Sequence, residues 1–259
     1  MTFLQACILF VAAILGGTLN SVAGGGTFIT LPALIFAGVL PINANATSTV
    51  ALWPGSIAST WAYRKEFARQ RRLVTTLLSI TSLIGGILGA ELLINTSQST
   101  FVKLLPYLLL LATVLFALSG PITTRLREKT TLKNRHSWLT LVGISSLQLI
   151  IAIYGGYFGG GIGILMLATL GLMGIENIHE MNAMKTLLTT FINGAAVIIF
   201  IIRGIVEWPQ AIVMVVGAII GGYTGAYFAR KIDQRWIRGF VILVGVSMTI
   251  YFFLRSISW

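Results

Sequence analysis

The sequence predicts an all-α protein, a polytopic transmembrane helical bundle of about eight to ten membrane segments. Of its 259 residues, 56% are hydrophobic and 10% are charged, whereas soluble domains average roughly 25% charged residues. So few charges cannot cover a water-facing surface. Lipid must therefore surround most of the chain, and lipid admits only helices or closed barrels. The apolar runs are long and lack the alternation of barrel strands, which favours helices.

The apolar runs differ in length, and the short ones are the informative ones. Several can cross a hydrocarbon core of ~30 Å at ~1.5 Å per residue. Residues 27–40 and 162–175 are too short, and each run follows a glycine cluster. Half-length helices behind glycine breaks predict re-entrant or discontinuous segments. The expected segments lie near 3–19, 27–40, 44–63, 73–94, 101–120, 138–154, 162–175, 181–202, 209–229 and 239–256.

The distribution of basic residues predicts the orientation. The formal net charge is +11, and most of the 18 basic residues fall within 64–72, 125–135 and 230–238. Short basic loops stay on the cytoplasmic side, which explains these clusters better than a nucleic-acid partner does. The loop 95–100 is uncharged, and Arg203 and Glu207 balance each other in the next external loop. We therefore expect a multi-pass protein of the bacterial inner membrane with both termini external.

The two halves of the chain resemble each other and are expected to be oppositely oriented. Gly24–Gly26 recurs as Gly159–Gly161, and Asn45 and Thr49 recur as Asn182 and Thr186. The pattern Gly-Gly-x-x-Gly-Ala at 85–90 recurs at 221–226. These matches predict a first repeat at 1–122, a basic cytoplasmic linker at 123–136 and a second, inverted repeat at 137–259. The alternative is a bundle with incidental glycine spacing.

Both glycine breaks are candidate binding elements. An unwound backbone at membrane depth is tolerated only inside protein or beside a water-filled cavity. It would leave free N–H groups at the start of the next helix, where the helix dipole favours an anion. The alternative is that the glycines only allow close helix packing. The candidate residues are Asn20, Gly24, Gly25, Gly26 and Thr27 in the first half and Gly159, Gly160 and Gly161 in the second.

The third segment of each half carries polar residues that could complete such a site. Buried amides and hydroxyls need partners, so these residues should face the bundle interior. An intramembrane cation such as Lys185 could neutralise a bound anion, and the first half has Ser48 at that position. Interhelical hydrogen bonding and snorkelling of Lys185 to the cytoplasmic surface are the alternatives. The candidates are Asn45, Ser48 and Thr49, with Asn182, Lys185 and Thr186.

Other ionisable residues suggest gating or proton coupling. Glu91 could relay protons, although an interfacial carboxylate fits its place near a helix end better. His179 and Glu180 form part of a short polar connection that could gate entry, or could be a solvated turn. The sequence shows no nucleophile–base pair, metal-ligand spacing or nucleotide loop. We therefore expect no enzyme activity, no metal and no cofactor.

The motifs at the breaks and third segments resemble those of the TauE/SafE (TSUP) family of sulfite and sulfonate exporters. The resembling stretches are 20–28 and 43–48 in the first half and 159–163 and 182–186 in the second. The similarity covers essentially the whole chain. It implies an inner-membrane transporter for small sulfur-containing anions such as sulfite or sulfonates.

Together these features predict a secondary transporter, an exporter in direction, of small organosulfur or sulfur oxyanions. Alternating access would expose a site held by the break N–H groups, the third-segment amides and Lys185. An anion channel or facilitator and a non-transporting membrane subunit are the alternatives. The expected partners are the small anion and the lipid bilayer, with a homodimer as an option.

Overall fold

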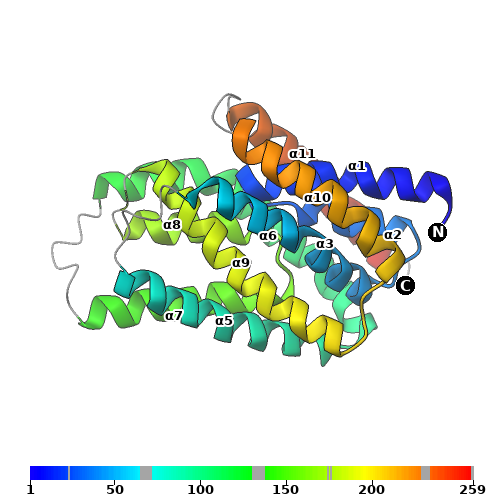
Figure 1. Cartoon of the computed structure of the whole chain (residues 1–259), viewed down its shortest axis with the longest axis horizontal. Coiled ribbons are helices and arrows are strands. Elements are labelled where there is room, and N and C mark those ends of the chain that lie inside the picture. Colours follow the sequence, from blue (N-terminus) through cyan, green and yellow to red (C-terminus); the bar gives the residue numbers. More distant parts are fainter. Residues whose placement is uncertain are drawn as a thin grey trace.

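The computed structural model describes residues 1–22, 24–64, 72–129, 138–173, 175, 177–228 and 234–257. Within these ranges the chain forms helices and no strands, which confirms the all-α prediction (Figure 1). The helices are α1 (Phe3–Val22), α2 (Thr27–Phe36), α3 (Pro41–Ala62), α5 (Arg72–Ile94), α6 (Gln98–Lys129), α7 (Trp138–Tyr157), α8 (Ile162–Leu172), α9 (Ile178–Ile202), α10 (Trp208–Phe228) and α11 (Gln234–Ile257).

Five helices in the described part of the chain are long and apolar enough to cross a membrane. They are α1, α5, α6, α9 and α10, and α2 and α8 are among the shorter apolar helices. The helix α3 carries more polar side chains, and most of its residues are buried inside the bundle. An enclosed helix can carry hydroxyls and amides because neighbouring helices, rather than lipid, meet them.

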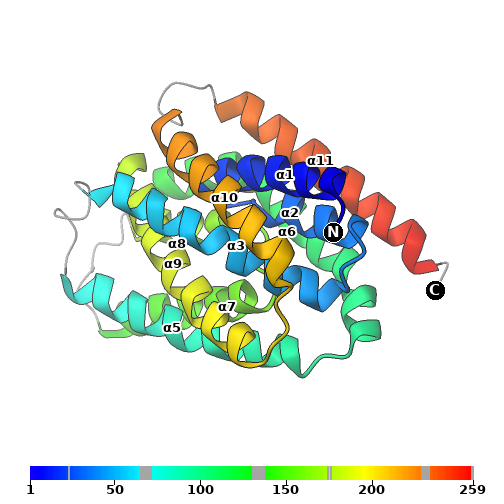
Figure 2. The same ribbon diagram turned by 45° about the vertical axis from the view of Figure 1, so that its right-hand side comes forward.

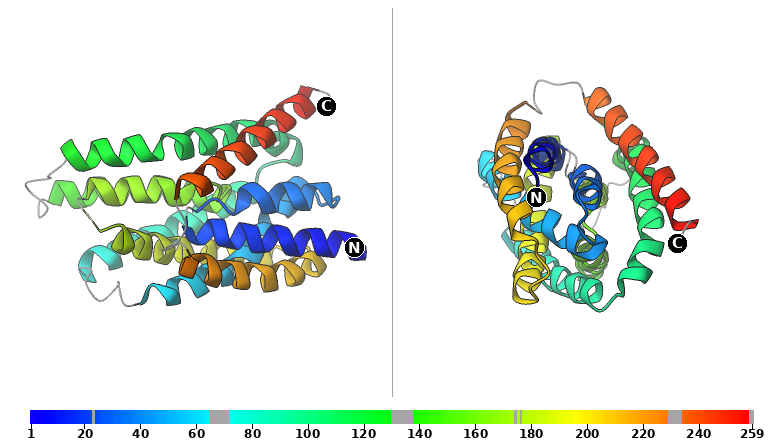
Figure 3. Two further views of the ribbon diagram at one scale, coloured as in Figure 1. Left: turned by 90° about the horizontal axis from the view of Figure 1, so that it is seen from above. Right: turned by 90° about the vertical axis from the view of Figure 1, so that its right-hand side faces the viewer.

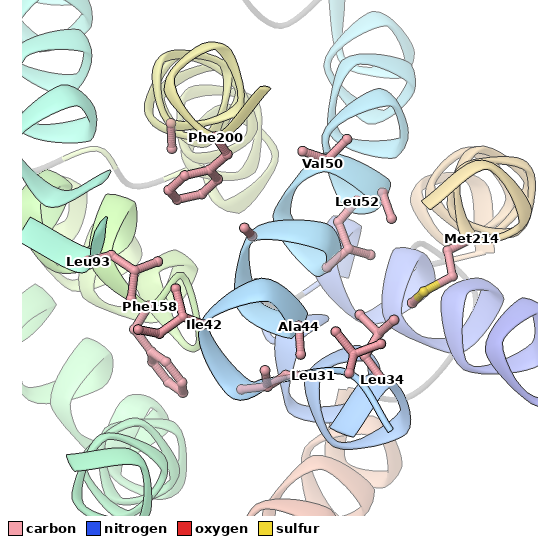
Figure 4. Packing of buried hydrophobic residues seen from close by; sticks show 14 of the residues in the cluster. Leu31, Leu34, Ile42, Ala44, Val50, Leu52, Leu93, Phe158, Phe200 and Met214 are labelled. Carbon is pink, nitrogen blue, oxygen red and sulfur yellow. The ribbon is translucent and has the colours of Figure 1, made fainter. Parts of the chain in front are cut away.

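The core is built around α3. Ala44, Val50 and Leu52 of α3 pack beside residues from α2, α5, α9 and α10, as Figure 4 shows. Phe158, at the end of α7, contributes its ring to the same cluster. The cluster therefore joins both halves of the chain in one interior.

Two helix boundaries differ from the sequence expectation. The helix α2 ends at Phe36, and Gly38 has a φ of +91°, a left-handed conformation that ends helices. The helix α6 continues to Lys129, so residues 123–129 of the expected linker are helical. Hydropathy locates the edge of the membrane, whereas a helix continues into water wherever no residue breaks it. The rest of that linker lies outside the described residues.

The helices of the two halves interleave instead of forming separate lobes. The helix α1 packs along α10, and α5 packs along α7. The interior helices α3 and α9 contact each other, and each also packs on the glycine-rich helix of the other half, α10 and α5 respectively. The right-hand view of Figure 3, close to the long axis, shows α6 and α11 side by side at one edge.

The termini and one inter-helix turn lie toward the same end of the bundle. Figures 1 and 2 place the start of α1 and the end of α11 toward one end, where the turn from α9 to α10 also lies. A chain whose two ends lie on the same side of a membrane crosses it an even number of times, and this arrangement agrees with such a path.

Gly89 of α5 sets the distance between α5 and α7. A Cβ there would collide with the backbone oxygen of Ile153, and would lie 2.7 Å from the backbone nitrogen of Tyr157. Backbone cannot yield as a side chain can. Glycine is therefore needed for this close approach, as in many membrane helix pairs.

Gly89→Ala is expected to lower the melting temperature in detergent by about 5 °C, because overpacking costs ~1–3 kcal/mol. Gly143→Ala is the matched control, since Gly143 lies on α7 with nothing within 4 Å of its would-be Cβ. Scanning fluorimetry of both purified variants makes the comparison. Equal melting temperatures for the two variants would show that the α5–α7 contact is not tight.

Candidate functional site

The two glycine breaks meet inside the bundle. The N–H of Gly161 donates to the backbone oxygen of Gly24 at 3.2 Å. A Cβ on Gly24 would lie 2.5 Å from the Cα of Gly163. Gly24, Gly25 and Gly26 are buried, as are Gly160 and Gly161, while Gly159 is half-buried. Segments about 135 positions apart therefore form one junction, which we call the glycine junction (residues 24–27 and 159–163).

Two helices begin at the glycine junction. The helix α2 follows Gly26 and α8 follows Gly161, and the φ of Gly161 is +77°. The N–H groups of Phe28 and Ile164 make the first bonds of these helices. The N–H groups of the residues that precede Phe28 and Ile164 donate no hydrogen bond within these helices. Both positive helix ends thus lie at the glycine junction, an arrangement that suits an anion.

Lys185 of α9 bonds to the chain just before the first glycine break. Its side chain is 1% exposed, and its Nζ donates to the backbone oxygen of Ser21 at 3.1 Å. Ser21 lies in the last turn of α1, three residues before Gly24. Among residues whose burial is described, Lys185 is the one charged side chain in the interior. Lys185 therefore points inward, and the snorkelling alternative does not hold in this structure.

Asn45 and Ser48 reach the other side of the glycine junction from α3. The Nδ2 of Asn45 donates to the backbone oxygen of Tyr157 at 2.9 Å. The Oγ of Ser48 lies 2.6 Å from the Oγ1 of Thr30 in α2. Both polar side chains are buried. The third segments of both halves therefore contact residues that flank the breaks.

The remaining candidates are buried or half-buried, but their hydrogen bonds differ. The hydroxyls of Thr49 and Thr186 donate to backbone oxygens of their own helices, at Asn45 and at Asn182 or Ala183. Those protons are not directed at a ligand, so the two threonines offer lone pairs in this conformation. The Nδ2 of Asn20 donates to Ser56 at 2.9 Å.

Thr27 is part of the glycine junction, and Asn182 lies on α9 three residues before Lys185. The Oδ1 of Asn182 is buried and accepts no hydrogen bond from the described residues. The Oγ1 of Thr27 would lie 3.6 Å from a Cβ built on Gly159. Thr27 thus lies close to the second break.

The candidate gating residues lie on α5 and α9. Glu91 pairs with Arg203 at 3.1 Å, with both side chains substantially exposed. The chain thus folds Arg203 onto α5, and the balance of the Arg203 and Glu207 charges in their loop stays a prediction. Glu180 lies in the first turn of α9 and is half-buried. His179 lies in the same turn, and its side chain is outside the described residues.

A pocket of about 660 Å³ lies between α5 and α9 and reaches Glu91. Its walls are mostly apolar, and Trp53 closes one side by donating its indole N–H to the backbone oxygen of Thr190 at 3.0 Å. None of the glycine-junction residues lines this pocket. The polar chemistry and this pocket are therefore separate features.

Sequence reasoning missed three partners at the glycine junction. Ser21 and Tyr157 contribute backbone oxygens, and Thr30 contributes a hydroxyl to Ser48. Backbone oxygens have no residue-type signature. Thr30 could have been noticed, because it is a hydroxyl one turn into a short helix that follows a break.

Comparison with known proteins assigns the fold to a family. The family model "Sulfite exporter TauE/SafE" matches residues 9–252. The chain belongs to the TauE/SafE family. A probable membrane transporter protein of Haemophilus influenzae is 29% identical over 243 residues, covering 93% of this chain and 92% of that protein. No solved structure gave a significant match.

Other TauE/SafE relatives agree with this assignment. The probable membrane transporter protein YfcA of Escherichia coli K12 is 30% identical over 248 residues, covering 93% of this chain and 87% of YfcA. YunE of Bacillus subtilis, also a probable membrane transporter protein, is 26% identical over 266 residues, with coverage of 93% and 96%. The chain is thus a multi-pass membrane transporter of the TauE/SafE type. The names of these relatives specify no substrate.

Proposed function

We propose that this protein exports small sulfur-containing anions, such as sulfite or sulfonates, across the bacterial inner membrane. It works as a secondary carrier, and the anion binds at the glycine junction. The observation that carries the proposal is that the two breaks meet through Gly24 and Gly161, while the buried Lys185 bonds to Ser21, three residues before Gly24. The choice of sulfur anions and of export rests on the family description.

Electrostatics supports an anion at this place. Each helix start carries roughly half a positive charge, and Lys185 adds a full charge in a low-dielectric interior. Lys185 donates to a carbonyl of α1 in this structure. Moving its Nζ toward an oxyanion would pair the ammonium with a full negative charge. The bound anion would receive donors from both halves.

Matching contacts support an inverted repeat. A Cβ on Gly221 would meet the backbone oxygen of Ile14, and a Cβ on Gly85 would lie 3.0 Å from that of Leu149. Gly221 is 136 positions after Gly85, and Leu149 is 135 positions after Ile14. Each half thus contributes the same helix face to the other. Such an exchange is what an approximate twofold axis produces, with each broken hairpin entering from its own side.

Direct contact between the breaks favours a carrier over a channel. Gly24 and Gly163 approach so closely that a single Cβ would not fit between them. A channel needs a continuous water path past the glycine junction. A carrier instead needs a barrier there whose position changes between its two states. With the basic loops in the cytoplasm, both termini would be external.

Counterflow in proteoliposomes tests the proposal. Vesicles preloaded with unlabelled sulfite or sulfoacetate should accumulate the ³⁵S-labelled anion transiently above its external concentration. Only a carrier with a shared site gives this overshoot. Labelled anion that merely equilibrates would support a channel, and vesicles that take up no more label than protein-free ones would contradict anion transport.

A further inference from the structure

The two halves differ at one position in charge, since the second half has a lysine where the first has a serine. Lys185 lies 137 positions after Ser48, the same separation that relates Asn182 to Asn45. In the second half, an ammonium sits against the last turn of α1 through the Ser21 oxygen. The corresponding contact of the first half's α3 is with the last turn of α7, where Asn45 bonds to the Tyr157 oxygen, while Ser48 contacts Thr30 of α2. A fixed cation in one half is matched by neutral oxygens in the other.

The hydrogen bond of Asn45 fixes which of its atoms is left over. The backbone oxygen of Tyr157 can only accept, so the NH₂ group of Asn45 must face it. The Oδ1 of Asn45 is therefore oriented away, and it is buried without a partner among the described residues. An orphaned buried acceptor is costly and indicates a missing donor or cation.

A chain of hydroxyls leaves Ser48 as a second acceptor. Thr30 Oγ1 donates to the backbone oxygen of Gly26 at 3.1 Å, and this uses its single proton. The 2.6 Å contact with Ser48 must then take its proton from Ser48. Lone pairs on Ser48 Oγ remain available. Ser48 lies three residues after Asn45, so the two side chains share one face of α3.

We propose that Asn45 Oδ1 and Ser48 Oγ, beside the carbonyl end of α7, bind a monovalent metal cation, Na⁺ or K⁺. The C-terminal end of a helix carries a partial negative charge, and broken helices in transporters hold cations at such ends. The described residues contain no group of three His, Cys, Asp or Glu that could hold a metal ion. A site lined by neutral oxygens suits a monovalent cation better than a divalent one. The bound ion would stand where Lys185 stands in the other half.

The protein could bind this cation whether or not it transports anions. A role of the cation as the coupling ion rests on the proposed function. The expected ion would lie opposite Lys185 across the glycine junction and would add attraction for the anion. Anion affinity would then depend on the cation, and by linkage cation affinity would depend on the anion.

The test is thermal unfolding of purified protein without any anionic substrate. NaCl or KCl is exchanged for choline chloride at constant ionic strength. A site half-filled near 1 mM should raise the melting temperature by about 5 °C at 100 mM metal ion. Equal melting temperatures in all three salts would overturn the proposal.

Three variants locate the effect. Asn45→Ala should lose the shift, while Asn193→Ala should keep it, because Asn193 also has a buried Oδ1 without a partner but lies on α9. Ser48→Lys supplies a tethered ammonium and should make stability insensitive to the salt. If Asn45→Ala retains the shift, or Asn193→Ala abolishes it, the assigned site is wrong. A shift that persists in protein with no counterflow would reject the transport proposal and keep the cation site.

Discussion

Lys185→Met is expected to reduce anion counterflow by roughly 10- to 100-fold, because a hydrogen bond to a charged group contributes ~1.5–3 kcal/mol and 1.4 kcal/mol is tenfold in affinity. Methionine keeps most of the side-chain length and removes the charge. The change leaves the Ser21 oxygen without the Nζ donor that it has now. The loss should appear as weaker apparent affinity for the anion, with the protein still folded.

Stability should not account for that loss. Methionine keeps most of the lysine volume, so the Lys185→Met protein should still unfold cooperatively, which thermal unfolding in detergent checks. Lys103→Met is the matched control, since Lys103 is exposed on α6. It should leave counterflow unchanged. Full transport by the Lys185→Met protein would remove the ammonium from the mechanism.

Gly24→Ala is expected to lower the melting temperature by roughly 10 °C and to abolish transport, combining ~1–2 kcal/mol of backbone strain with ~1–3 kcal/mol of overpacking. The φ of Gly24 is +77°, where side chains are strained. The added Cβ would also lie 2.5 Å from the Cα of Gly163. The two effects together should force the breaks apart.

Gly38→Ala separates these two effects. Gly38 has a φ of +91° but nothing within 4 Å of its would-be Cβ. It should therefore show the strain alone, a fall of about 3 °C, with transport kept. Thermal unfolding and counterflow are measured on both variants. If Gly24→Ala behaves like Gly38→Ala, the breaks do not need to touch for transport.

Much of the fold was predictable because lipid simplifies the problem. Long apolar runs gave the spanning helices, and the short runs behind Gly24–Gly26 and Gly159–Gly161 predicted α2 and α8. The end of α6 was not predictable from hydropathy, since charged residues continue a helix outside the membrane as readily as they end it. The pairing of Arg203 with Glu91 depends on tertiary contact between α5 and the turn after α9.

The candidate site was predictable in its residue types more than in its bonds. Glycine clusters and a lysine within an apolar run are visible in sequence, and the structure joins Gly24 to Gly161 and Lys185 to Ser21. Which atoms remain available depends on local geometry. Thr49 and Thr186 donate their protons to their own helices, so these threonines differ from the amides in what they can offer.

The most direct test of the glycine junction as an anion site is X-ray diffraction from crystals soaked in selenite. Selenite matches sulfite in charge and shape, and selenium scatters anomalously; Cys7→Ser protein avoids its reaction with the exposed thiol. We expect an anomalous peak between the starts of α2 and α8, about 3–4 Å from Lys185 Nζ. Peaks only at the protein surface, in protein that still transports selenite, would contradict the account.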